Sequence, residues 1–422
     1  MTREEALEHF KKEYCDKYFL QMDKKIDAFI KENEEKLLLE FIENFRSLCL
    51  KIKEMQAGGL TPKIAYITYS FGIDNINGES QEYEVQAYGK EWFFEESEEC
   101  KIPYDVRWLY SIMEETYKEL LDVSKKYIGQ ITSDDLADVR KRGVVRCDVS
   151  LVKFVKIAIE KAVQIDEFKL IEKEEVLEIR IGEYKGYNEI IYKEDIRKKD
   201  SKEIVAWLEG KNGTYSYEIL SELDLSGGDY EKITMHYADL SKCDLSNANF
   251  KDASLIGTKF IAAKIDNTNF KNTVLAEANF DSTVINNSNF QGSSLRASDF
   301  SNAKIDGCNL QNVNFSKSNL SNCIIKNTNL EKGKFLFTCL ENSDLSEQDL
   351  RNSLFSSVNL KGANLSDADL RGVEFENVDL TQTNLDNAKF GQNKIFKLKI
   401  LAKDVAKLDI TEEQKKELII VN

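Results

Sequence analysis

Residues of the kinds that carry out chemistry are few in this chain and are widely spaced. The 422 residues include two histidines, His9 and His236, and each is expected to be an isolated surface side chain. The eight cysteines form no CxxC pair and no cluster with histidine. Phosphate-binding loops, nucleophile elbows and zinc-helix motifs are also missing from the sequence. We therefore predict no catalytic residue, no metal and no cofactor.

Two acidic runs, residues 95–99 and 172–175, are the remaining candidates for a divalent metal site. Calcium and magnesium bind through oxygen ligands such as carboxylates. Carboxylates that follow one another along the chain do not fix a ligand geometry, however, and charge runs usually form solvated surface. The favoured interpretation of both runs is therefore a solvated loop or face.

A third polar pattern is a series of Asn and Asp residues spaced twenty apart. It consists of Asn249, Asn269, Asn289, Asn309, Asn329, Asp349 and Asp369. Carbonyl and carboxylate oxygens at such regular spacing could contact a partner protein. Asn and Asp also tolerate corner conformations and hydrogen-bond to neighbouring backbone, and we favour this structural explanation.

The structural elements that carry this series can be predicted from a five-residue repeat in the sequence. Every fifth residue from Leu240 to Phe390 is large and apolar, and a small residue usually lies two positions before it. This period fits neither a helix nor a simple strand, and it indicates a chain that turns a corner every five residues. Similar large residues recur every twenty positions, as in Phe250, Phe270 and Phe290, so four sides make one coil.

These repeats resemble the A(D/N)LXX consensus of the pentapeptide-repeat family. The matching runs include Ala238-Asp239-Leu240, Ala363-Asn364-Leu365 and Ala368-Asp369-Leu370. The resemblance covers residues 221–390 and implies a right-handed, four-sided β-solenoid. Some members of the family resemble duplex DNA and bind or protect DNA gyrase, a type II topoisomerase, so the resemblance implies this activity as one alternative here.

Residues 1–212 are expected to form an α+β domain that is mostly helical at its N-terminus, and we recognise no family in it. Apolar residues at spacings of three and four predict helix over residues 2–55. Strand patterns predict hairpins over 63–88 and 176–192. Further helices are expected to begin at Ser133 and at Ser150.

The solenoid, residues 213–390, needs a cover at both ends because its last coils would expose core and unpaired backbone. The helix that contains Trp207 and the first, irregular coils are expected to cover one end. Residues 391–422 are expected to form a C-terminal helical cap that also joins two copies as a homodimer. Its apolar residues are Leu398, Leu401, Val405, Leu418, Ile419 and Ile420.

Leu336 and Phe337 interrupt the polar residues at the outward positions of the repeat. Two explanations are open. The pair forms an exposed apolar contact, or a local bulge folds one of the two side chains inward.

Composition limits the classes of function. The chain carries 58 Lys+Arg against 74 Asp+Glu, a net charge of −16, which argues against direct binding of nucleic acid. No apolar run is long enough to span a bilayer, and the cysteine pattern fits a reducing cytoplasm. We expect a non-catalytic interaction or scaffold protein with an unidentified protein partner. The alternatives are a gyrase-binding DNA mimic, and an enzyme in residues 60–210 that has no recognisable motif.

Overall fold

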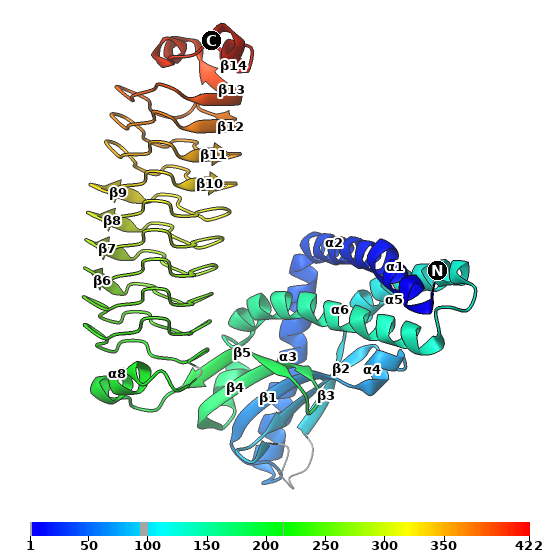
Figure 1. The fold of residues 1–422 in the computed structure, drawn as a ribbon. Helices are drawn as coiled ribbons and strands as arrows, with labels where there is room; N and C mark the ends of the chain where they lie inside the picture. Colours follow the sequence, from blue (N-terminus) through cyan, green and yellow to red (C-terminus); the bar gives the residue numbers. More distant parts are fainter. Residues whose placement is uncertain (1, 93–99, 214) are drawn as a thin grey trace. The chain divides into compact units, whose positions relative to one another are not determined.

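The computed structural model describes residues 2–92, 100–213 and 215–422, which form two compact units (Figure 1). The first unit is Met1–Arg197 and the second is Lys198–Asn422. The expected border between the domains is residue 212. The second unit instead begins at Lys198, so it includes the short helix Ser201–Glu209. Each unit is described by itself.

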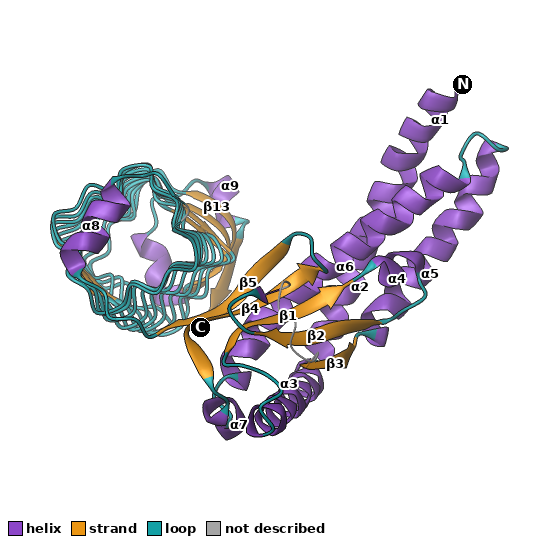
Figure 2. Ribbon diagram, turned by 90° about the horizontal axis from the view of Figure 1, so that it is seen from below, coloured by secondary structure: helices purple, strands orange, loops and turns teal. Residues whose placement is uncertain are grey.

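A five-stranded sheet with the order β3-β2-β1-β4-β5 forms the centre of the first unit (Figure 2). Strands β1 and β4 are parallel, and all other neighbours are antiparallel. Both expected hairpins are present, as β1–β2 and β4–β5. The strands are β1 (Ile64–Phe71), β2 (Glu82–Tyr88), β3 (Cys100–Asp105), β4 (Lys173–Glu183) and β5 (Asn188–Asp195).

Helices of this unit pack on the sheet face that carries Tyr69 and Tyr83. Phe41 of α3 stacks on Tyr69 with ring centroids 5.4 Å apart. The hydroxyl of Tyr83 donates a hydrogen bond of 3.1 Å to Asp148 of α6. The helices are α1 (Arg3–Phe10), a π-helical turn (Lys11–Cys15), α2 (Asp16–Glu32), α3 (Glu34–Ala57), α4 (Ile73–Asn77), α5 (Arg107–Ser124), a 3-10 turn (Lys125–Tyr127), α6 (Ser133–Ala162) and α7 (Asp166–Leu170).

The prediction of separate helices starting at Ser133 and Ser150 is wrong. A single helix, α6, runs through both positions, and its capping box joins Thr132 to Asp135. Ser150 is buried inside the helix. The apolar residues around it, including Cys147, Leu151 and Phe154, stay on one helical stripe, so tertiary packing overrides the capping preference of serine.

The second unit begins with α8 (Ser201–Glu209) and continues as a four-sided β-solenoid of about eight coils, as predicted. Parallel bridges join residues twenty apart, for example Asn249 to Asn269. One side forms the sheet β6 (Lys264–Asp266), β7 (Val284–Asn286), β8 (Lys304–Asp306) and β9 (Ile324–Lys326). Another forms β10 (Lys334–Leu336), β11 (Leu354–Ser356), β12 (Glu374–Asp379), β13 (Lys394–Leu401) and β14 (Leu418–Val421).

The solenoid core consists of the large residues of the five-residue series, stacked from coil to coil. Phe270 stacks between Phe250 and Phe290, with centroid distances of 5.3 and 4.7 Å. The phenylalanines change sides near residue 310, where Phe300 meets Phe315 edge-on at 5.8 Å. The predicted inward positions are thereby confirmed.

Each corner of the solenoid places one residue in the left-handed region of the backbone map. Asn247, Asn267 and Asn287 have φ values of 60°, 55° and 49°. Asparagine and glycine adopt this conformation most readily, which explains why they are so frequent two positions after the large residue. The corner requirement accounts for the asparagines at this position, but not for those directly before the large residue, such as Asn249 and Asn269.

The expected covers are present at both ends, but the C-terminal one has a different structure. At the start, the predicted helix that contains Trp207 is present as α8, and Leu208 rather than Trp207 is buried against the solenoid core, since Trp207 is 43% exposed. At the other end, the predicted helix over residues 395–408 is wrong. Ile395 and Leu398 lie in strand β13, which pairs in parallel with β12.

The five-residue series in fact continues beyond Phe390, through Ile395 and Ile400, so the solenoid extends past the expected border at 390. The described helical segments that follow are short, a 3-10 turn (Ala402–Lys407) and α9 (Glu412–Lys415), and β14 then pairs with β13. Leu398, Val405 and Leu418 pack on the solenoid core and Leu401 is half-buried, whereas Ile419 and Ile420 are exposed.

Candidate interaction surface

The Asn and Asp series holds the corners of the solenoid, as the structural explanation predicts. In each of the seven residues a side-chain oxygen accepts a hydrogen bond from the backbone N–H two positions later, at 2.9 to 3.3 Å. The amide of Asn269 also donates to Asn249 at 2.9 Å. Arg351 and Arg371 pair with Asp349 and Asp369. These polar atoms already have partners within the chain.

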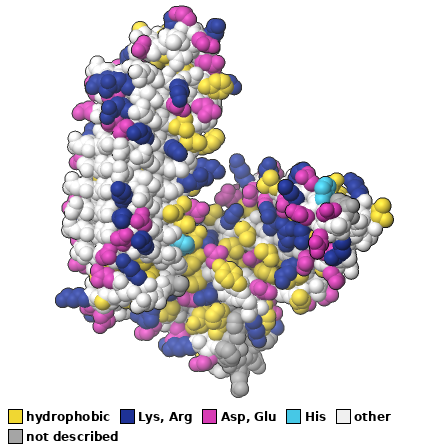
Figure 3. All heavy atoms as spheres, viewed as in Figure 1, with side chains coloured by type: hydrophobic (Ala, Val, Ile, Leu, Met, Phe, Trp, Pro, Cys, Tyr) yellow, Lys and Arg dark blue, Asp and Glu magenta, His cyan; other side chains and the backbone are white. Residues whose placement is uncertain are grey.

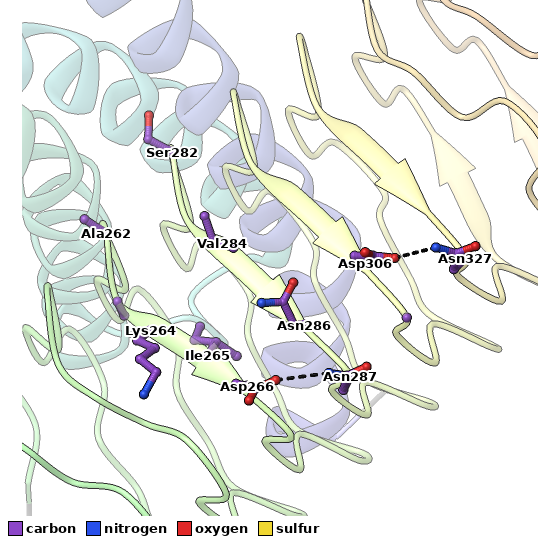
Figure 4. A pocket seen from close by; sticks show the side chains of 12 residues that line it. Ala262, Lys264, Ile265, Asp266, Ser282, Val284, Asn286, Asn287, Asp306 and Asn327 are labelled. Carbon is purple, nitrogen blue, oxygen red and sulfur yellow. Dashed lines mark hydrogen bonds between the residues drawn. The ribbon is translucent and has the colours of Figure 1, made fainter.

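A hollow of about 730 Å³ lies along β6–β9 (Figure 4). Its carboxylates are occupied, because Asn287 donates to Asp266 at 3.2 Å and Asn327 donates to Asp306 at 2.8 Å. The half-exposed side chain of Val284 also lines the hollow. Because its acids are paired internally, the hollow has the character of a sheet surface rather than of a ligand pocket.

Phe337 is the most exposed of the large apolar residues in the described repeats, and in these residues no bulge folds Leu336 or Phe337 inward. Strands β10 and β11 stay in register, with Leu336 opposite Ser356, and Phe335 fills the inward position. Phe337 is 63% exposed. Phe337 also occupies a left-handed corner with φ of 55°, a conformation that costs a bulky residue about 1 kcal/mol. The structure therefore excludes the inward bulge, and an exposed contact remains the open explanation.

Among the described residues, three cations on the same side of the solenoid have no acidic partner. Elsewhere in the repeats, a lysine commonly pairs with an acid one coil away, as Lys242 does with Glu222 at 2.7 Å and Lys399 with Asp379 at 2.8 Å. In the described part of the chain, no carboxylate lies within ion-pair distance of Arg296, Lys317 or Lys334. Together with Leu336, Phe337 and Leu354, these cations define what we call the aromatic-basic face.

Sequence reasoning found Leu336 and Phe337 but missed the three cations. A signal was present, because the residues twenty positions before and after each cation are uncharged. For Lys317 they are Ala297 and Phe337. Charge partners in a solenoid are neighbours along the stack and not along the chain, so the sequence must be read in steps of twenty to find them. In Figure 3, much of the visible solenoid surface is uncharged.

The first unit contains an acidic group that sequence reasoning also missed. Asp148 accepts the Tyr83 hydroxyl on a largely buried stretch of α6. Burial raises the pKa of Asp148 to about 6 from its ordinary value of 3.8, and the hydrogen bond from Tyr83 partly opposes this rise. A single carboxyl with a tyrosine does not form a catalytic set.

Asp148→Asn should therefore stabilise the first unit at pH 7.5 by about 2–3 kcal/mol, since it removes a buried charge and keeps an acceptor for Tyr83. In the folded protein the pKa of Asp148 is raised, so the carboxyl is neutral below about pH 4 and costs the fold no stability there. As the pH rises through about 6, the buried carboxyl loses its proton and the wild-type protein becomes less stable than the Asn variant. Urea unfolding of both proteins from pH 4 to 8 checks this. A stability difference that does not grow across that interval would contradict it.

The other candidates from the sequence have ordinary surroundings. His9 lies 2.8 Å from the Tyr127 hydroxyl, and burial lowers the pKa of His236. Among residues 172–175, Lys173 pairs with Glu194 and Glu174 with Lys90. The run 95–99 lies outside the described residues. In the described part of the chain, no group of three or more His, Cys, Asp or Glu side chains could hold a metal ion. Among the described helices, none combines the length and the apolar character needed to span a membrane.

The second unit is a β-solenoid, and its repeats match known families. A family model described as "Pentapeptide repeat region" matches residues 233–309. A second family model, described as "Pentapeptide repeats (8 copies)", matches four overlapping segments between residues 293 and 392. Residues 233–392 are thus a region of pentapeptide repeats. The first unit has no family match. A comparison with curated proteins gives no significant match.

Several solved structures are similar to the solenoid. HetL, a pentapeptide repeat protein involved in heterocyst differentiation regulation in the cyanobacterium Nostoc, is 16% identical over 48% of this chain and 97% of its own, with a TM-score of 0.31. Trypsin-treated QnrB1, a plasmid-mediated fluoroquinolone resistance protein, is 23% identical over 42% and 87%, with a TM-score of 0.35. A Cyanothece pentapeptide repeat protein is 26% identical over 25% and 86%, with a TM-score of 0.25.

Proposed function

We propose that this chain is a non-catalytic interaction protein whose solenoid binds a partner protein through the aromatic-basic face. The observation that carries the proposal is the exposed ring of Phe337 in a strained corner. Asn, Gly or Ser would fill that corner at lower cost, so an exposed Phe there is explained by contact with a partner. Exposed aromatic residues are frequent anchors of protein interfaces.

The charges of this face favour a partner with an acidic rim around an apolar pocket. Arg296, Lys317 and Lys334 lie on successive coils, so they extend over roughly 10 Å along the stack. They are unpaired within the described residues although the whole molecule is acidic. Carboxylates placed around an apolar site would pair with them while Phe337 enters the site. The same cations interrupt any continuous anionic surface, which disfavours the DNA-mimic alternative.

The variant Phe337→Asn tests this function. It should stabilise the solenoid by about 0.5 kcal/mol, because Asn suits the left-handed corner better than Phe. It should also abolish capture of the partner by the full chain from a native lysate. The measurements are thermal unfolding and quantitative mass spectrometry of captured proteins.

A matched control is Asn327→Phe, which places the same aromatic ring at the equivalent corner on the opposite side. This variant should keep the partner. Equal capture by the wild-type chain and Phe337→Asn would refute the proposed face. A separate experiment measures the activity of purified gyrase in the presence of each protein. If the wild-type chain and Phe337→Asn inhibit gyrase equally, the result favours the DNA-mimic alternative.

The exposed edge of β14 supports the proposal of a homodimer through the C-terminus. β14 is the last strand of its sheet in the described structure, and Ile419 and Ile420 are 53% and 54% exposed. An apolar edge strand can pair with the same strand of a second copy. Sedimentation at tens of micromolar, with Ile420→Lys as the variant, tests this arrangement separately from partner capture.

A further inference from the structure

A groove between two helices of the first unit forms a second candidate binding site. Helices α2 and α6 run side by side (Figures 1 and 2), and ion pairs close the first part of their seam. Asp16 accepts from Arg142 at 3.0 Å, and Asp23 accepts from the Nε of Arg146 at 3.2 Å. Further along, where α2 turns into α3, the seam is no longer closed.

The open part of the seam is a hollow of about 240 Å³ with an apolar floor. Ile30 and Leu38 line one wall, and Phe154 and Ala158 of α6 line the other. Ile157 also lines the hollow and is 61% exposed, although it lies on the best-buried stretch of α6. An exposed isoleucine beside an apolar groove is explained if another apolar surface covers both.

The rims of this groove differ in charge. The α6 rim carries Lys153 and Lys161, which are eight residues and therefore about 12 Å apart along the helix. The α2–α3 rim is mixed, with Asp27, Lys31 and Glu34. In the described residues, no ammonium group among these lysines lies within ion-pair distance of a carboxylate. By contrast, Arg142 and Arg146 of α6 form ion pairs with Asp16 and Asp23 of α2.

We propose that this groove binds an amphipathic helix of another protein, with acidic residues along the flank that faces α6. The hollow is smaller than the roughly 300–1,000 Å³ typical of small-molecule sites, and it suits one or two apolar side chains of a helix. Acidic residues two turns apart on that helix would reach Lys153 and Lys161. The occupant inserts apolar residues between Phe154 and Leu38 and covers Ile157.

The test uses the full chain and two synthetic amphipathic peptides of about 20 residues, the length at which helices begin to form in water. Both present leucines on one face. The first has glutamates along one flank, and the second has lysines there. Fluorescence anisotropy should show saturable binding of the glutamate peptide, about tenfold tighter than that of the lysine peptide.

The charge-reversal variant Lys153→Glu with Lys161→Glu should weaken the glutamate peptide by about tenfold and strengthen the lysine peptide. The control Lys118→Glu with Lys141→Glu changes the net charge equally outside the groove lining, and it should leave both affinities within about twofold. Unchanged melting temperatures show that both variants fold.

Three results would overturn the proposal. They are absence of saturable binding, equal losses in the groove and control variants, and displacement of the peptide by laurate at micromolar concentration. The last result would mean that the groove takes a small anionic amphiphile instead of a helix.

Discussion

Replacing Phe270 with Asp should unfold the solenoid, with a loss of at least about 5 kcal/mol in the free energy of unfolding. Phe270 is fully buried, stacks on Phe250 and Phe290, and meets Phe260 edge-on at 5.9 Å. The substitution removes these contacts and places an unpaired carboxylate in an apolar interior. Urea unfolding followed by circular dichroism measures the loss.

Asn269→Asp is the matched control at the neighbouring outward position. Sequence reasoning predicts a nearly neutral effect. The structure revises this value to about 1 kcal/mol, because the Asn269 amide donates to Asn249 and an aspartate would lose that bond. The effect remains far smaller than that of Phe270→Asp. Similar melting points for the two variants would show that the inward and outward assignments are wrong.

Truncation after Phe390 should have the second largest effect, a loss of about 5 kcal/mol together with aggregation. It removes β13 and so uncovers the buried side chains of Phe375, Leu380 and Leu385. Each exposed large side chain costs about 1.5–3 kcal/mol, and the open strand edge promotes association. Light scattering and urea unfolding of the 1–390 chain provide the measurement.

A milder truncation, after Leu408, serves as the comparison. It keeps β13, Leu398 and Ile400 and removes only α9 and β14. We expect this chain to stay folded, because the buried residues of β13 still cover the last coil. If the 1–390 chain is as soluble and stable as the full chain, residues 391–422 have no capping role.

The solenoid could be predicted in detail because its large inward residues recur every five positions from Leu240 to Phe390 without exception. Its C-terminal cover could not, since apolar residues at 395, 398, 401, 405 and 408 fit a helix as well as a coil. The decisive signal was the continued spacing of five through Ile395 and Ile400. Position 393, a buried asparagine, hides this continuation because it stands where a small residue is expected. Its amide donates to the backbone of Leu370 and Val373.

The first unit was predictable in its two hairpins and in the helical character of residues 2–55, but the single helix α6 and the candidate sites were not. The pairing of β1 with β4 joins segments more than a hundred residues apart, and no local pattern specifies it. Asp148 and the lysines of the groove acquire their properties from residues on other helices and strands. The aromatic ring of Phe337 was recognisable because it violates the polarity of a strict repeat.

Site-specific photo-cross-linking at position 337 tests the central proposal most directly. A photoreactive phenylalanine analogue replaces Phe337 in one full-length protein and Asn327, at the opposite corner, in another. The account predicts one dominant cross-linked protein at 337 that is missing at 327 and is lost when Lys317 and Lys334 are both changed to Glu. The same cross-linked proteins at both positions would contradict it.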